Sequence, residues 1–206
     1  IFFLLFFWSA HYLFTFFNKE KADSYMELSV SNGETAHFQF SDGTKIQLNA
    51  ESSIRFPEYF QNDKREVFLH GEAYFQVSEN NKCPFVIHTA DLDIRVIGTT
   101  FNVRADEEII ETTLVEGKVQ VFSKNSTKGM RQEHLINAGQ QLSYHKEAAN
   151  FQLNEVDPNL YTSWKEGYYK FSGIKLDRLI KSIERLYDVE IQLETPELRN
   201  FTFSGS

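Results

Sequence analysis

The residues best suited to catalysis or metal binding are scattered along this 206-residue chain. Its six histidines are His11, His37, His70, His88, His134 and His145. No two of them are four residues apart and none belongs to an HExxH motif, so their spacing does not predict a zinc site. The single cysteine, Cys83, has no intrachain disulfide partner, and its position beside Pro84 favours a structural role.

Two further spacings match part of a catalytic pattern. Ser172 and Lys175 have the SxxK spacing of serine acyl-enzymes, but the partner motifs of those enzymes are absent. Asp91 and Asp93 flank Leu92 in a predicted strand, so both carboxylates point to one face. Such a pair could serve acid–base catalysis, but an exposed strand face is the favoured interpretation. We therefore expect no enzyme, no catalytic or metal-binding residue and no cofactor.

Aromatic residues near the C-terminus are the candidates for partner binding. Residues 168–171 are predicted to form a strand that includes Tyr168 and Phe171. An exposed strand edge offers unpaired N–H and C=O groups to a partner strand. Trp164 could anchor a partner, although a core position is the favoured interpretation.

Composition restricts the class of protein. The net charge is -8 and the isoelectric point is about 5.3, which argues against direct nucleic-acid binding. Past the first 18 residues the chain is long enough for one domain or two small ones. With one cysteine, the fold must depend on a hydrophobic core.

Residues 1–17 are strongly apolar and carry no charged side chain. As a helix they would rise about 26 Å, slightly less than the roughly 30 Å of a bilayer core. A transmembrane helix over residues 1–18, truncated at its N-terminus, is the favoured interpretation. A signal-type sequence and a buried core helix are the alternatives. Residues 19–32 are then expected to be a juxtamembrane linker.

Residues 33–156 are predicted to be an all-β domain. Asp42-Gly43 lies between two alternating runs, which indicates a hairpin. Short strands are predicted at 35–40, 45–48, 66–69, 73–77, 85–88, 92–97, 100–104, 109–115, 118–122, 141–144 and 151–156. A ragged glycine repeat at Gly71, Gly98, Gly117 and Gly139 is compatible with a solenoid-like or a sandwich-like fold.

Residues 157–206 are predicted to be a small α+β domain that is truncated at its C-terminus. Asp157-Pro158 indicates the start of a short helix that ends at Gly167. After the strand at 168–171, an apolar stripe at helical spacing predicts an amphipathic helix: Leu176, Leu179, Ile180, Ile183 and Leu186. Strands are predicted at 189–193 and from 201, which gives the order β-α-β-β.

Five motifs in sequence order resemble the FecR family of membrane-bound sigma-factor regulators. They are Asp42-Gly43-Thr44 with Leu48-Asn49, Gly71-Glu72-Ala73-Tyr74-Phe75-Gln76-Val77, Pro84-Phe85-Val86, Gly98-Thr99-Thr100-Phe101-Asn102-Val103, and Glu116-Gly117-Lys118-Val119. The last part of the chain, from Trp164 to Phe203, resembles the small C-terminal domain that often follows. That domain is similar to the short N-terminal domain of secretins and TonB-dependent transporters.

The resemblance implies a single-pass protein of the inner membrane with most of this chain in the periplasm. Its expected partners are the membrane, the signalling domain of a TonB-dependent transporter, and an extracytoplasmic-function sigma factor. The sigma factor would be bound by a cytoplasmic segment absent from this sequence. The resemblance also implies structural roles for the motif residues: Gly71, Gly98 and Gly117 at tight turns between rungs, Phe75, Val77, Phe101 and Val103 in the core, and Glu72 as a polar residue at a turn.

Two rival functions remain open at this stage. One is a membrane-tethered carbohydrate- or peptidoglycan-binding module, with a groove lined by Tyr59, Phe60, Tyr74 and Tyr144. The other is a β-solenoid enzyme acting on polysaccharide, which would need a cluster of charged groups on one face that the sequence does not indicate.

Overall fold

Strand β5 (Arg65–Gln76) connects the two halves of a curled β-sheet. Its first part, up to His70, pairs with β4 (Ser52–Pro57) and β6 (Phe85–His88). Its second part, from Gly71, pairs with β3 (Lys45–Leu48) and β8 (Thr100–Ala105). The computed structural model describes residues 24–60, 64–124 and 132–206.

The sheet continues outward from β5 in both halves. The first half, toward β11, also contains β1 (Tyr25–Val30), β7 (Leu92–Val96), β10 (Lys118–Ser123) and β11 (Glu133–Asn137). The second half, toward β13, also contains β2 (Ala36–Gln39), β9 (Ile109–Glu116), β12 (Gln140–His145) and β13 (Asn150–Glu155). Every strand pair of this sheet is antiparallel except β5 with β6.

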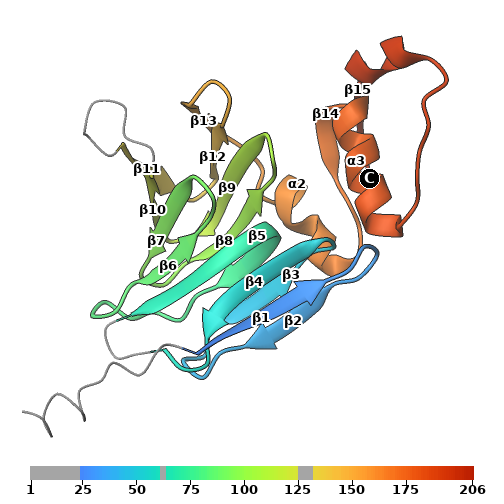
Figure 1. Cartoon of the computed structure of the whole chain (residues 1–206). Coiled ribbons are helices and arrows are strands. Elements are labelled where there is room, and N and C mark those ends of the chain that lie inside the picture. The colour runs from blue at the N-terminus through green and yellow to red at the C-terminus, as the bar shows by residue number, and fades with distance from the viewer. Residues whose placement is uncertain (1–23, 61–63, 125–131) are drawn as a thin grey trace, which may run out of the picture.

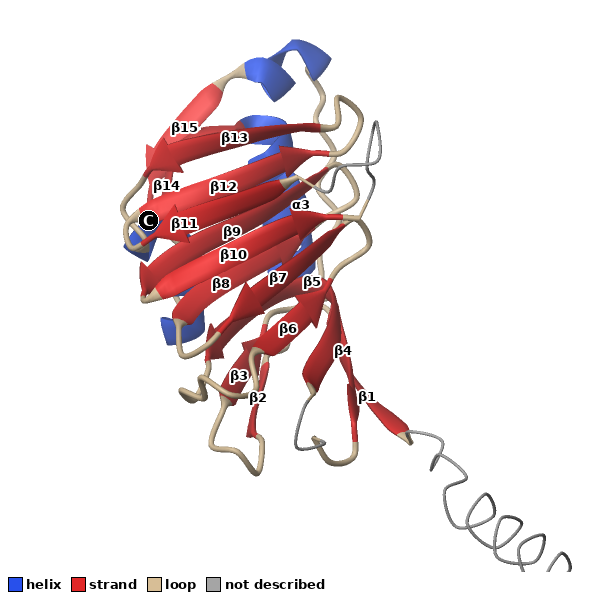
Figure 2. Ribbon diagram, turned by 90° about the vertical axis from the view of Figure 1, so that its left-hand side faces the viewer, coloured by secondary structure: helices blue, strands red, loops and turns tan. Residues whose placement is uncertain are grey.

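The two halves face each other and enclose one hydrophobic core (Figures 1 and 2). Alternation along the strands places the inward side chains there, as with Phe75 on β5 and Phe101 on β8, whose rings stack 5.2 Å apart. Phe85 on β6, in the opposite half, lies 6.3 Å from the Phe75 ring. A buried aromatic or branched side chain of this kind contributes about 1.5–3 kcal/mol to stability.

The mainly β prediction is confirmed, and the antiparallel pairing matches its sandwich-like form. A solenoid would stack parallel rungs, whereas the strand pairs here, β5 with β6 excepted, are antiparallel and Gly98, Gly117 and Gly139 lie in connections that cross from one half of the sheet to the other. Gly71 does not lie in a turn between rungs, because β5 runs through it as one strand where two were predicted. Strands β1, β4 and β11 were not predicted. Pairing along β1 makes residues 25–30 part of the sheet and not of a linker.

The C-terminal unit, residues 157–206, contains α2 (Asn159–Thr162), η1 (Ser163–Glu166), β14 (Phe171–Lys175), α3 (Leu176–Tyr187), η2 (Pro196–Asn200) and β15 (Thr202–Gly205). The Asp157 carboxylate accepts the Asn159 N–H at 3.0 Å at the start of α2. The predicted strand at 189–193 is wrong, because those residues have no strand partner. The strand predicted at 168–171 begins only at Phe171, and β14 pairs with β15.

Within the described ranges, no helix has the length and apolar character needed to cross a membrane. The transmembrane helix predicted at residues 1–18 lies outside those ranges.

Candidate functional site

The C-terminal unit is docked on the outer face of the second half of the sheet, the face turned away from the core (Figure 1). Strand alternation sends Glu72 and Asn102 to this face, because their neighbours Ala73, Phe101 and Val103 point into the core. Polar side chains can occupy an outer face at no cost while water covers it. Here a second unit covers them, so they need partners within the protein.

Glu72 is the centre of the contact. Its side chain is only 9% exposed, and each carboxylate oxygen accepts a hydrogen bond from an amide. Asn102 Nδ2 donates to Oε1 and Asn49 Nδ2 donates to Oε2, both at 2.9 Å. Asn49 follows β3 and Asn102 lies on β8, so the carboxylate links three adjacent segments of the sheet. These bonds fix the orientation of both amides toward the C-terminal unit.

The C-terminal unit supplies the other side of the contact. Trp164 Nε1 donates to Asn102 Oδ1 at 3.2 Å, and the Tyr169 hydroxyl donates to Asn49 Oδ1 at 3.3 Å. A guanidinium nitrogen of Arg185 lies 3.7 Å from Glu72 Oε2. We call Asn49, Glu72, Asn102, Trp164, Tyr169 and Arg185 the Glu72 cluster. It joins the sheet to η1, to the segment before β14 and to α3.

Further ion pairs extend the contact along α3. Arg178 lies 3.3 Å from Glu111 on β9, and Lys181 lies 3.1 Å from Glu108. Arg185 also lies 3.6 Å from Asp106, which receives a 2.7 Å contact from Arg104. Exposed pairs such as the one with Lys181 contribute little, whereas the half-buried pairs fix how α3 sits on the sheet.

The interface changes the acidity of Tyr169. Burial and the neighbouring charge of Glu72 raise the pKa of Tyr169 to about 12, from its usual value of 10. Above pH 10 an unfolded chain ionises this hydroxyl before the folded chain does. The stability that the raised pKa contributes is therefore complete below pH 10 and is lost as the pH rises toward 12.

We expect the free energy of unfolding of the wild type to fall between pH 10 and 12 by about 1 kcal/mol more than that of Tyr169→Phe. The full pKa shift of Tyr169 would correspond to a larger free energy, but Tyr169 is half-exposed and solvent screens its surroundings. Urea denaturation at about pH 8 and about pH 11.5 measures the difference. Tyr59→Phe, at a tyrosine that is 73% exposed, is the control and should follow the wild type. Identical pH profiles for wild type and Tyr169→Phe would contradict the assignment.

A second polar cluster has a structural role. Arg65 is 3% exposed, and its guanidinium contacts Asp42 Oδ2 and the Ser78 carbonyl at 2.9 Å and the Cys83 carbonyl at 2.8 Å. Asp42 also accepts hydrogen bonds from the N–H and the hydroxyl of Thr44. The motif around Gly43 therefore fixes the hairpin between β2 and β3 to β5. Cys83 is buried.

The predicted partner-binding residues fall in different environments. Trp164 is 4% exposed and belongs to the Glu72 cluster, so its indole holds the chain's own two units together. Tyr168 is 43% exposed, and Phe171 is half-buried at the start of β14. Most remaining motif residues are buried: Thr44, Phe75, Val77, Phe85, Thr99, Phe101 and Val103. A core position for Phe75, Val77, Phe101 and Val103 is what the family resemblance implies. Pro84 is half-buried.

Asp91 and Asp93 are both half-buried, on either side of the buried Leu92, and each contacts a basic side chain. The Asp91 carboxylate lies 3.6 Å from Lys146, while Asp93 lies 2.7 Å from His88. The four aromatic residues suggested for a glycan groove are dispersed. Tyr59 is exposed, Tyr74 and Tyr144 are buried, and Phe60 packs against Phe40 with ring centroids 4.7 Å apart.

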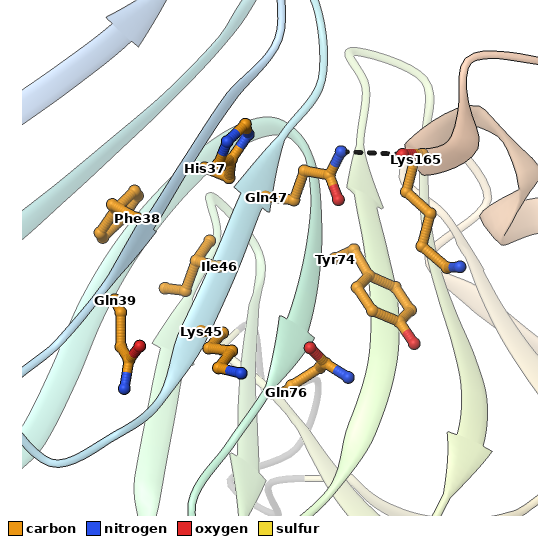
Figure 3. Close-up of a pocket in the computed structure, with 9 residues that line it drawn as sticks. All are labelled: His37, Phe38, Gln39, Lys45, Ile46, Gln47, Tyr74, Gln76 and Lys165. Atoms are coloured by element: carbon orange, nitrogen blue, oxygen red, sulfur yellow. Dashed lines mark hydrogen bonds between the residues drawn. The ribbon is translucent and has the colours of Figure 1, made fainter.

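A shallow pocket of about 380 Å³ lies on the outer face of β2, β3 and β5 (Figure 3). It is lined by outward side chains such as Gln39, Gln47 and Gln76. Lys165 closes one end, where its carbonyl accepts a hydrogen bond from Gln47 at 3.1 Å. The Lys165 ammonium lies 5.5 Å from the Tyr74 ring centroid. Because Tyr74 is only 9% exposed, this pocket does not present an open aromatic surface for a sugar ring.

Sequence reasoning missed Tyr169 and Arg185 as interface residues. Arg178 and Arg185 are seven residues apart, which places them on one side of α3 beside its apolar stripe. That spacing was a usable indication that charged side chains on this helix face a partner surface. No local pattern identified Tyr169.

Comparisons with known proteins match both parts of the chain. A family model described as "FecR protein" matches residues 26–120, and one described as "FecR, C-terminal" matches residues 168–206. A comparison with curated proteins found no match.

Two crystal structures of provisionally assigned anti-sigma factors from Parabacteroides distasonis have similar folds. The structure at 2.50 Å resolution is 29% identical in sequence, with a TM-score of 0.80 over 88% of this chain and 84% of that chain. The structure at 1.65 Å is 28% identical, with a TM-score of 0.80 over 87% and 83% of the two chains.

Proposed function

Because the chain belongs to the FecR family, we propose that it is a regulator of the anti-sigma type, which controls transcription by restraining a sigma factor. The observation that carries the proposal is the match of a FecR and a FecR C-terminal model to one chain, together with the fold it shares with provisionally assigned anti-sigma factors. The family is regulatory, and the proposal assigns no catalytic step.

Co-purification tests this role. The whole protein, affinity-tagged and extracted from membranes, is expected to retain an extracytoplasmic-function sigma factor. Overproducing it is expected to lower transcription from a promoter dependent on that factor by about fivefold or more. A change of this size corresponds to a coupling free energy of about 1–3 kcal/mol between two binding events. Absence of any sigma factor, with unchanged transcription, would contradict the proposal.

We further propose the direction of the relay. The chain would be held in the inner membrane by residues 1–18, with residues 24–206 in the periplasm. There the C-terminal unit would receive the signalling domain of a TonB-dependent transporter. The Glu72 cluster supports this arrangement, since a partner that binds the C-terminal unit would act on residues in direct contact with the sheet. The coupling would be an equilibrium between docked and undocked forms, which the partner biases by preferring one of them.

We expect the partner to add a strand to β14, the longer strand of the small sheet. Phe171→Pro should weaken binding of a transporter signalling domain about tenfold or more, because proline removes a backbone donor and cannot continue a ladder. Phe171→Ala keeps the backbone N–H and should weaken binding less than threefold. A surface-plasmon assay with both variants measures this. Equal affinities for proline and alanine would exclude strand addition at this residue.

A further inference from the structure

A cavity of about 630 Å³ lies between α3 and the outer face of the second half of the sheet. Packed protein surfaces normally leave few voids larger than a water molecule. Small-molecule sites typically measure about 300–1,000 Å³. The C-terminal unit therefore covers the sheet without filling the space beneath it.

The two walls of the cavity differ in polarity. On one side lies the apolar stripe of α3, including Leu179, Ile183 and Leu186. No residue of this helix is fully buried, and Leu179, Ile183 and Leu186 are half-buried, so part of the stripe stays accessible. On the other side are Thr113 and Gln141, which bond to each other at 2.9 Å. A molecule that fits both walls has an apolar body and a polar end.

The charges of the lining favour an anion. In a chain of net charge -8, the cavity is lined by four cationic side chains, Arg104, Lys170, Arg178 and Arg185, and two anionic ones, Glu72 and Glu111. The local excess is about one positive charge, because Asp106, just outside the lining, lies 2.7 Å from Arg104 and 3.6 Å from Arg185, and it is opposite in sign to the net charge of the whole protein. It would attract a negatively charged ligand.

Among the cations of the lining, Arg185 has hydrogen-bonding capacity that its contacts do not use. Its two carboxylate contacts, to Glu72 and Asp106, are long at 3.7 and 3.6 Å. Its Nε atom is buried and has no hydrogen-bond partner among the described residues. A buried donor without an acceptor is unfavourable, and a guanidinium binds carboxylates and phosphates through two parallel N–H groups. The Arg185 side chain is 12% exposed, so an incoming anion would bind the accessible part of the guanidinium and not the enclosed Nε.

We propose that this cavity binds a small anionic amphiphile. The carboxylate or phosphate of the ligand is held by Arg185, and its apolar body lies along Leu179, Ile183 and Leu186. Such a ligand contacts both the sheet and the C-terminal unit, so it favours the docked form in proportion to its concentration. The site goes beyond the regulatory role and does not depend on it.

Photolabelling of the full chain in lipid nanodiscs tests the proposal. The probe is decanoic acid with a diazirine on its chain, compared with the corresponding alcohol, and labelled peptides are mapped by mass spectrometry. We expect saturable labelling of α3 by the acid at an apparent affinity about tenfold above that of the alcohol, as one charge-assisted contact provides. Competition by unlabelled decanoate or by decyl phosphate then identifies which acid group is preferred.

Variants locate the site. Arg185→Gln should reduce the affinity of the acid about tenfold and leave the alcohol unchanged. Arg95→Gln, at an exposed arginine of β7, is the charge-matched control and should change neither. Ile183→Trp and Leu179→Trp each fill the space and should abolish labelling of α3 by both probes, with thermal unfolding confirming that the chain is folded. The proposal is overturned by equal labelling with acid and alcohol, or by α3 labelling that persists in both folded tryptophan variants.

Discussion

Gly71→Ala should lower the free energy of unfolding by about 2–5 kcal/mol. Gly71 has φ of +82° at the point where β5 passes from one half of the sheet to the other. A Cβ atom there would lie 2.8 Å from the Ser52 Cα and Cβ atoms and closer still to its hydroxyl. The left-handed conformation costs a side chain about 1–2 kcal/mol, and overpacking adds about 1–3.

The contact cannot relax cheaply. The Ser52 hydroxyl accepts the N–H of Glu72 at 2.8 Å, so Ser52 is held in place by the strand that the new methyl group would push away. Any shift would also move Glu72, the centre of the interface. We therefore expect the loss of stability to be accompanied by weaker docking of the C-terminal unit.

Gly139→Ala is the matched control for this substitution. Gly139 has the same φ of +82°, but the nearest atom to a Cβ there is 4.0 Å away. Gly139→Ala should lower the free energy of unfolding only by the cost of the left-handed backbone conformation, about 1–2 kcal/mol. Denaturant unfolding of the two variants separates backbone strain from steric contact. Equal losses at both positions would show that the approach of Ser52 to Gly71 does not constrain the fold.

Gly71 also marks the limit of what the sequence predicts about the fold. The core residues that the resemblance implies on β5 and β8, Phe75, Phe101 and Val103, are buried, and their period-two spacing is a local property of the sequence. The same alternation broke at Gly71, so two strands were predicted where one strand bends between two sets of partners. Which strands pair is decided by residues far apart in sequence. This is also why residues 189–193 alternate without forming a strand.

The site was predictable only in part, for a related reason. The motifs singled out Glu72 and Asn102, and alternation places both on the outer face of the sheet. Their burial depends on Trp164, 62 residues from Asn102, and on an arginine of α3. A polar residue that a second unit covers has the same local pattern as one that faces water. Only the tertiary arrangement distinguishes a docking contact from a solvated surface.

Glu72→Ala is the second variant with a large expected effect, a loss of about 3–5 kcal/mol in the stability of the docked form. Removing one partner of a buried charged group leaves the others without compensation. Here the Asn49 and Asn102 amides lose their acceptors, and Arg185 loses one of its two carboxylates. Glu116→Ala, at an exposed glutamate at the end of β9, should change stability by less than about 0.5 kcal/mol.

Tryptophan emission distinguishes undocking from global unfolding. In a Trp8→Phe background the indole of Trp164 is the single reporter, and it is buried against Asn102 when the unit is docked. Glu72→Ala should shift this emission to longer wavelength and raise hydrogen exchange in α3 at denaturant concentrations where the sheet is intact. Loss of the α3 and sheet signals in a single transition would instead assign Glu72 to the stability of the whole fold.

The double variant decides whether the contact with Arg185 is a real coupling. If the two side chains attract each other, the guanidinium of Arg185 is left without that attraction once Glu72 is removed. The double variant Glu72→Ala, Arg185→Met should then lose about 0.5–3 kcal/mol less stability than the two single variants lose together. Additive losses would mean that the 3.7 Å approach contributes nothing and that the two asparagine bonds hold the unit. A positive coupling would mean that α3 and the sheet are linked through the Glu72 carboxylate. A partner that binds the C-terminal unit would then act on the sheet through Glu72.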